Sequence, residues 1–92
     1  MLYMTIVTWE PAQRDAVLKR FAAGGAKMPD GVKTLGLWAD AHGGRIFQLS
    51  DWSVPHDAKR IVESTMPWTD LCKIECLEVV EAAELMKLLP KR

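Results

Sequence analysis

The sequence predicts an α+β fold in which four antiparallel strands form one sheet and two helices cover one of its faces. Segments rich in β-branched and aromatic residues predict strands at 2–9, 33–51 and 71–80. Segments with apolar residues at helical spacing lie between them. Ala41-His42-Gly43-Gly44 divides the 33–51 segment into two strands joined by a tight turn. The resulting order of strand, helix, hairpin, helix and strand is the split βαβ, or ferredoxin-like βαββαβ, arrangement.

The first strand, Leu2–Trp9, is apolar on both faces, which predicts that both faces are covered. Glu10-Pro11 then begins a helix, because proline is tolerated at the first helical position. Gly24-Gly25 ends this helix, since glycine accepts the left-handed conformation of a helix cap. Met28-Pro29-Asp30-Gly31 predicts a turn before the hairpin.

The length of the hairpin loop determines which side chains share a face of the sheet. A three-residue loop, 42–44, with Gly44 left-handed pairs Trp38 with Gln48. A two-residue Gly-Gly loop instead places Trp38 beside Leu49 and Phe47. A slip of one residue exchanges the two faces. We favour the three-residue loop because it alone separates an apolar face from a mixed one.

The second half of the chain predicts another helix, a last strand and a short C-terminal helix. Ser53 caps the second helix, which has Pro55 in its first turn and ends at Met66-Pro67. The last strand is Leu71–Val80, and the C-terminal helix is Glu81–Leu89. We expect residues 1–92 to form a single domain.

The predicted register assigns the strand residues to a face under the helices and to an open face. The helix-covered face holds Leu2, Met4, Ile6, Leu35, Leu37, Phe47, Leu49, Ile74 and Cys76. The open face holds Tyr3, Val7, Trp9, Trp38, Ile46, Leu77 and Val79. An apolar face of this size on a small domain marks an interface or a ligand site. The expected partner is a second copy of the chain, bound through the open sheet face.

Composition excludes several classes of function. Twelve basic residues balance twelve acidic ones without a basic run, which argues against nucleic-acid binding. An apolar run of about 20 residues, the length of a membrane span, is absent from the sequence, so no membrane partner is expected. Met1–Val7 lacks the features of a signal peptide, which predicts a soluble, cytoplasmic protein.

The open face provides the candidate ligand site. Trp38 and Gln48 are predicted cross-strand neighbours, with Tyr3, Thr5 and Glu75 nearby. A flat aromatic ring with a few polar groups in an apolar cleft is typical of small-molecule sites. The alternative is that these residues only make packing and dimer contacts. Glu75 serves as an acid or base only if it is buried, and Lys73 on the same face is its simpler partner.

The histidines and cysteines predict no cofactor or metal. His42 beside Gly-Gly is expected to be a solvated turn residue, and His56 a surface residue. A third ligand at metal-binding spacing is absent from the sequence, so no zinc site is predicted. Cys72 and Cys76 are expected to be buried structural thiols, too far apart along one strand to bridge.

Several short motifs resemble a family of short bacterial domains of unknown function within the dimeric α/β-barrel superfamily. The motifs are Met28-Pro29-Asp30-Gly31, Trp38-Ala39-Asp40, Gly43-Gly44-Arg45-Ile46-Phe47-Gln48-Leu49 and Trp68-Thr69-Asp70-Leu71. The resemblance implies a homodimer whose two sheets pack face to face around a cavity. Superfamily relatives include cofactor-free monooxygenases, lactone isomerases, polyketide cyclases and haem enzymes. The family implies no catalytic residue.

Two functional hypotheses follow. The first is an uncharacterised homodimeric domain that holds a small apolar or aromatic ligand in a cavity between the sheets. The alternative is a cofactor-independent monooxygenase or isomerase with Glu75 or His42 as its base. An RNA-recognition domain has the same strand order, but the central strands here lack its aromatic and basic residues.

Overall fold

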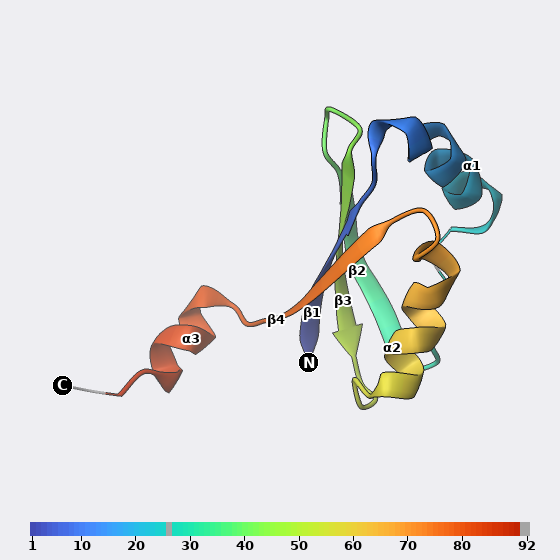
Figure 1. Cartoon of the computed structure of the whole chain (residues 1–92). Coiled ribbons are helices and arrows are strands. Elements are labelled where there is room, and N and C mark those ends of the chain that lie inside the picture. Colours follow the sequence, from blue (N-terminus) through green and yellow to red (C-terminus); the bar gives the residue numbers. More distant parts are fainter. Residues whose placement is uncertain (26, 91–92) are drawn as a thin grey trace.

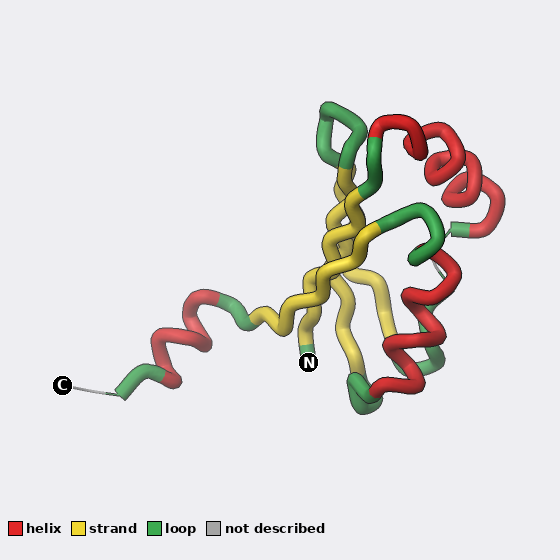
Figure 2. Tube along the Cα trace, viewed as in Figure 1, coloured by secondary structure: helices red, strands yellow, loops and turns green. Residues whose placement is uncertain are grey.

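The computed structural model describes residues 1–25 and 27–90, which form one antiparallel sheet and its helices (Figure 1). The strands are β1 (Leu2–Thr8), β2 (Val32–Ala39), β3 (Arg45–Trp52) and β4 (Lys73–Val79), in the order β2-β3-β1-β4. The α-helices are α1 (Arg14–Gly24), α2 (Ala58–Thr65) and α3 (Ala82–Leu88). Short 3-10 helices, η1 (Pro11–Gln13) and η2 (Met66–Trp68), precede α1 and follow α2. Helices α1 and α2 lie on the same side of the sheet (Figure 2), so the α+β, ferredoxin-like arrangement is confirmed.

The second helix begins later than predicted. Asp57, not Ser53, is its N-cap, and the Asp57 carboxylate accepts a hydrogen bond from the backbone N–H of Arg60 at 3.0 Å. This bond satisfies a backbone donor in the first turn that has no partner within the helix. The Ser53 hydroxyl instead donates to the carbonyl of Gly31 at 2.7 Å, which ties the start of β2 to the end of β3.

The predicted hairpin register is wrong by one residue. The backbone N–H of Asp40 bonds to the carbonyl of Arg45 at 2.9 Å, which leaves 41–44 as a four-residue loop. Gly43 has the left-handed conformation, with φ of 78°, because the turn reverses there rather than at Gly44. Trp38 therefore lies opposite Phe47 instead of Gln48.

The two central strands, β1 and β3, show the opposite faces to those predicted. Side chains under the helices are Tyr3, Thr5, Val7, Ile46, Gln48 and Ser50. Their neighbours on the open face are Leu2, Met4, Ile6, Phe47 and Leu49. The edge strands match the prediction: Ile74 and Cys76 lie under the helices, whereas Leu77 and Trp38 are on the open face. The Trp38 indole covers Gly36, where an added Cβ would collide with it.

The core lies between the sheet and α1, and its buried members come from five different segments. They are Trp9, Val17, Ile46, Trp68 and Cys72. The side chain of Arg20 clamps α1 over this core: its guanidinium holds both carboxylate oxygens of Asp70, at 2.7 and 2.9 Å. The same guanidinium donates to the carbonyl of Pro67 at 2.7 Å. Two parallel bonds to one carboxylate fix α1 against the segment that leads into β4.

Helix α3 extends away from the sheet and from the other two helices (Figure 1). All its residues are exposed, including Leu85, Met86 and Leu88. Isolated helices shorter than about 12 residues are marginal in water, so packing against another surface would stabilise α3. Among residues 1–25 and 27–90, no helix combines the length and apolar character needed to cross a membrane.

Candidate functional site

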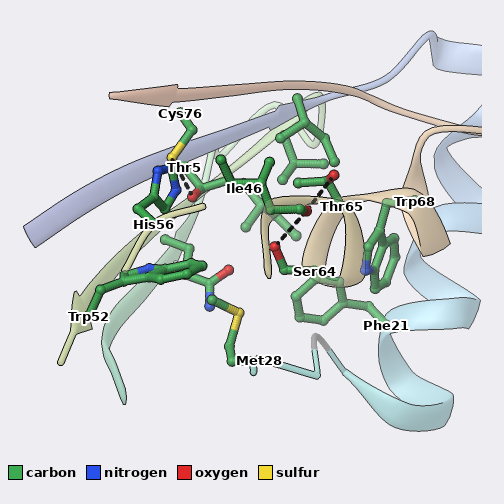
Figure 3. A pocket seen from close by; sticks show the side chains of 14 residues that line it. Thr5, Phe21, Met28, Ile46, Trp52, His56, Ser64, Thr65, Trp68 and Cys76 are labelled. Carbon is green, nitrogen blue, oxygen red and sulfur yellow. Dashed lines mark hydrogen bonds between the residues drawn. The ribbon is translucent and has the colours of Figure 1, made fainter. Parts of the chain in front are cut away.

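The sheet and its two covering helices enclose a cavity of about 50 Å³ (Figure 3). Its floor is the covered face of β1, β3 and β4: Thr5, Val7, Ile46, Gln48, Ile74 and Cys76. Its roof comes from α1, α2 and η2: Phe21, Ile61, Ser64, Thr65 and Trp68. Met28, Trp52 and His56, from three loops or strand ends, complete the wall. The cavity thus lies inside one copy of the fold.

The lining of the cavity contains no Lys, Arg, Asp or Glu among the residues that the structure describes. A charged ligand would therefore lose its hydration without an opposite charge to compensate. The volume is also well below the roughly 300–1,000 Å³ of sites for drug-sized ligands. Size and charge together favour a small neutral ligand.

Three polar side chains meet at the β4 end of the cavity (Figure 3). The sulfur of Cys76 lies 3.6 Å from Nε2 of His56, and the hydroxyl of Thr5 donates to the same sulfur at 3.7 Å. Thr5 and Cys76 are paired across β1 and β4, so the sheet register sets their contact. A thiol beside an imidazole nitrogen is the arrangement that activates sulfur as a nucleophile.

Two aromatic rings hold the imidazole of His56 in place. The ring stacks on Tyr3 with centroids 3.8 Å apart and 16° between the planes. Trp52 meets the same imidazole edge-on, with centroids 4.5 Å apart. Burial raises the pKa of the Tyr3 hydroxyl, and the nearby Glu78 and Cys76 raise it further. Tyr3 therefore stays neutral near pH 7 and acts here as an aromatic surface.

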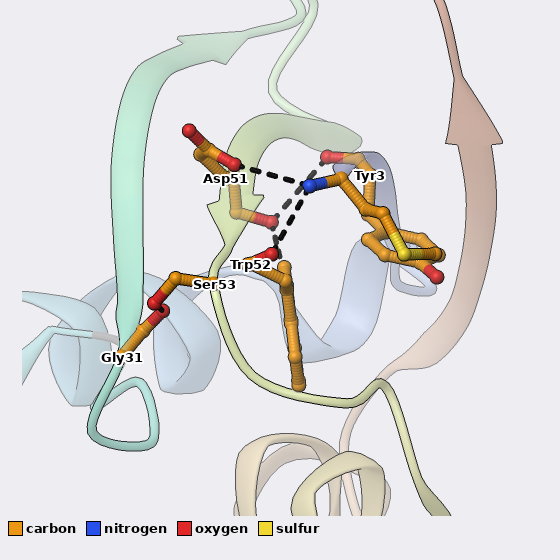
Figure 4. A network of polar contacts seen from close by, with 7 residues as sticks. Tyr3, Gly31, Asp51, Trp52 and Ser53 are labelled. Carbon is orange, nitrogen blue, oxygen red and sulfur yellow. Dashed lines mark hydrogen bonds and ion pairs between the residues drawn. The ribbon is translucent and has the colours of Figure 1, made fainter.

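Polar contacts at the adjacent end of the sheet fix Trp52 (Figure 4). The backbone N–H of Trp52 donates to the carbonyl of Met1 at 2.8 Å, and the Met1 amine donates to the carbonyl of Trp52 at 3.1 Å. The same amine pairs with Asp51 at 3.3 Å. The Trp52 indole N–H donates to the hydroxyl of Ser50 at 3.1 Å. These contacts fix the wall against which His56 rests.

Comparison with known protein families identifies the chain. The model of the family described as Domain of unknown function (DUF3303) matches residues 1–92. The chain belongs to the DUF3303 family. No curated protein and no solved structure matches it.

In this DUF3303 domain, the five residues of the predicted ligand site lie on opposite sides of the sheet. Thr5 and Gln48 are cross-strand partners that line the cavity, and Tyr3 lies beside them under His56. Trp38 and Glu75 are on the open face, where Glu75 lies opposite Ile6. The structure therefore does not bring Trp38 together with Gln48.

The structure corrects two predictions about titratable side chains and confirms a third. His56 is half-buried against the cavity instead of on the surface, and the thiol of Cys76 is exposed instead of buried. His42 is a solvated turn residue, as predicted, with its ring next to Asp40. The sequence carries one relevant signal, which is that Thr5 and Cys76 would be neighbours in an antiparallel pairing of the first and last strands. The approach of His56 depends on the loop before α2.

The polar end of the cavity brings together two side chains of types that can bind metal ions, His56 and Cys76. Within the described part of the chain, no group of three or more His, Cys, Asp or Glu side chains is placed to hold a metal ion. His56 and Cys76 form a pair without a third ligand of this kind. What the arrangement offers is thiol and imidazole chemistry.

Proposed function

We propose that this domain binds a small neutral ligand, apolar or aromatic, in the cavity between its sheet and helices. The observation that carries the proposal is the uncharged apolar cavity with Gln48 and the His56–Cys76 pair on its wall. A mostly apolar pocket with a few polar groups is the usual form of a small-molecule site. The proposal moves the ligand from between two sheets, where the sequence predicted it, to the interior of each copy.

Phenol and benzoate are matched probes for this proposal, because they differ mainly in charge at pH 7. Phenol at about tenfold excess over its Kd should stabilise the protein by about 1.4 kcal/mol, read as a rise in Tm. Benzoate should give no shift, since the cavity has no cation to pair with its carboxylate. Met28 on the wall is flexible and can adjust to an aromatic ring.

Filling the cavity should abolish the phenol effect. Ser64→Leu adds a larger side chain to the roof, whereas Glu63→Leu places the same side chain on the exposed surface of α2. Phenol should raise the Tm of the Glu63→Leu protein and leave that of Ser64→Leu unchanged. An equal response of the two variants, or equal shifts with phenol and benzoate, would overturn the proposal.

We further propose that the domain is a homodimer joined through its open sheet faces, as in dimeric α/β barrels. The support is the exposed apolar side chains on that face, which include Trp38 and Leu77, each 53% exposed. A second copy can cover this face, because in a two-fold symmetric dimer the same surface patch of each copy packs against the other. Helix α3 also has exposed apolar side chains and extends away from its own sheet, so we propose that it packs on the partner.

The dimer has a matched pair of test variants. Leu77→Glu places a charge on the open face, and Val62→Glu places one on the outer surface of α2, where Val62 is 50% exposed. In sedimentation experiments at micromolar concentration, wild type and Val62→Glu should be dimers, and Leu77→Glu a monomer. A monomeric wild type would exclude the dimer without affecting the cavity proposal.

The alternative of a cofactor-independent oxygenase or isomerase named Glu75 or His42 as its base. Glu75 is on the open face, and the side chain of His42 is 96% exposed in the hairpin loop. Neither residue lines the cavity. Any chemistry in the proposed ligand site would therefore use other residues.

A further inference from the structure

We propose that Cys76 and His56 form a reactive pair that captures small α,β-unsaturated carbonyl compounds covalently in the cavity. This inference deepens the proposed function, because it names the chemical class of the ligand and the atom that reacts with it. It rests on the proposed cavity site, in which the thiol, the imidazole and the uncharged walls lie together.

The first step of the argument is the position of the thiol. Cys76 lines the cavity and is exposed, whereas Cys72, the other free cysteine, is buried in the core. A small molecule can therefore reach the sulfur of Cys76 but not that of Cys72. Reactive cysteines are partly accessible, and buried structural ones are inert.

The second step is the group that accepts the thiol proton. Nε2 of His56 lies 3.6 Å from the sulfur, and stacking on Tyr3 with an edge contact to Trp52 holds that nitrogen towards it. The Thr5 hydroxyl donates to the sulfur from the other side, which stabilises developing negative charge there. The sulfur of Cys76 therefore contacts both a proton acceptor, His56, and a hydroxyl donor, Thr5.

The third step is the chemistry of the electrophile. The cavity is small and its described lining residues include no charged side chain, so the reactant is small and neutral. An addition reaction needs no redox partner, and the described residues of the cavity lining provide no second cysteine for a redox exchange. An α,β-unsaturated aldehyde or ketone meets these requirements.

The reaction balances with the groups present. The Cys76 sulfur forms a bond to the β-carbon as its proton passes to Nε2 of His56. The C=C π electrons move to the carbonyl and give an enolate. The imidazolium then returns the proton to the α-carbon, which leaves a saturated thioether adduct and a neutral His56.

The test uses N-ethylmaleimide, a neutral α,β-unsaturated carbonyl reagent, on the whole protein at pH 7. Peptide mass spectrometry follows the alkylation of each cysteine separately. The reference is an unstructured peptide with the sequence of β4, which contains Cys76 and lacks the fold. Because an ordinary thiol is only a few per cent ionised at pH 7, Cys76 in the protein should react about tenfold faster than the peptide. Equal alkylation rates of Cys76 in the wild-type protein and in the peptide would by themselves overturn the proposal.

Two histidine variants test whether His56 acts as a base or only supports the structure. His56→Phe retains an aromatic ring to stack on Tyr3 but has no nitrogen, and His42→Phe makes the same change in the exposed loop. Alkylation of Cys76 should fall to the peptide rate in His56→Phe and stay at the wild-type rate in His42→Phe. Circular dichroism checks that both proteins are folded. A wild-type rate in folded His56→Phe would contradict the role of His56.

The pH dependence of the alkylation rate distinguishes base assistance from packing, because a purely structural role of His56 would not change it. Tyr3 and Glu78, from β1 and β4, are titratable groups near the pair: Tyr3 stacks on His56, and burial and then both Glu78 and Cys76 raise the pKa of Tyr3. The rate advantage over the peptide should decrease as the pH rises, because hydroxide then removes the thiol proton without help from His56. A constant ratio across this range would exclude base assistance by His56.

Reagent charge connects the reaction to the cavity. Neutral iodoacetamide should retain the rate advantage over the peptide, and anionic iodoacetate should lose it, because the lining has no cation. Phenol binding to the wild-type protein distinguishes this inference from the proposed function. If phenol binds and maleimide shows no rate advantage, covalent capture fails and ligand binding stands.

Discussion

On the two central strands of the sheet, the face under the helices is more polar than the open face, although a covered face is usually the more apolar one. The face under the helices includes Thr5, Gln48 and Ser50, whereas the open face of the same two strands is formed by larger apolar side chains such as Ile6 and Phe47. The buried polar groups are satisfied by specific partners: Gln48 donates to the hydroxyl of Thr34 at 3.0 Å. A uniformly apolar row therefore does not identify the side that the helices cover.

The difference also indicates where chemistry and assembly lie. Polar groups under the helices provide the walls of a cavity and a thiol–imidazole contact. Apolar side chains without cover provide a surface that would be stabilised by a second copy. The proposed ligand site therefore lies on the covered face, and the proposed dimer surface on the open face.

The largest expected effect on stability comes from replacing one tryptophan on each face of the sheet. Trp52 is 4% exposed under the helices, and Trp38 is 53% exposed on the open face. Trp52→Ala should lower the free energy of unfolding by about 3–5 kcal/mol, the usual loss for a buried large aromatic residue. Trp38→Ala should cost less than about 1 kcal/mol at concentrations where the protein is monomeric. Urea unfolding measures both, and similar losses would show that the two faces are equally packed.

An intermediate effect is expected for the polar group buried deepest under the helices. The hydroxyl of Ser50 accepts the indole N–H of Trp52 and donates to the carbonyl of Tyr3 at 3.4 Å. Ser50→Ala leaves the indole N–H without a partner and should cost about 1–3 kcal/mol. Ser53→Ala, which removes an exposed hydroxyl, is the control and should cost less, because water replaces its bond. If both variants lose equal stability in urea, the satisfied polar group is not what distinguishes the covered face.

The smallest effect concerns the ion pair that clamps α1 over the covered face. The hydrogen bonds from Arg20 hold the pKa of Asp70 below its ordinary value. A lowered pKa in the folded state adds stability above about pH 4 that is lost as pH falls through the folded pKa. Both groups are exposed, so solvent screening keeps the effect small.

Asp70→Asn should therefore flatten the loss of stability with acid that wild type shows below about pH 4. Urea midpoints measured from pH 3 to pH 7 follow the change. Arg20→Met should flatten the same range, since it removes the other partner of the pair. An unchanged acid profile in both variants would show that the pair contributes no pH-dependent stability.

The register error shows what a strand pattern cannot determine. The β1 and β3 segments are apolar on both faces, so alternation alone did not indicate which row faces the helices. The sequence prediction assigns the more apolar row to the core and gives the loop three residues, whereas the loop in the structure has four. Each change of one residue exchanges the faces of a strand. Trp38 was still placed correctly on the open face, because β2 and β3 slipped relative to each other.

The candidate site could be predicted only in part. The sequence prediction places Thr5 and Gln48 near each other on the open face; the strands do place them side by side, but on the face under the helices, where they line the cavity. His56 and Cys76 are 20 residues apart, on a loop and an edge strand, and no spacing rule connects them. Their contact depends on how the loop before α2 crosses the end of the sheet.

The sequence by itself determined the α+β class, the order of the elements and the faces of the edge strands. Glycine, proline and local periodicity carry that information, because they act through backbone geometry within a few residues. Tertiary structure decided which face of β1 and β3 the helices cover, and it brought His56 to Cys76. These outcomes depend on long-range packing and on partners for buried polar groups, which neighbouring residues in the chain do not specify.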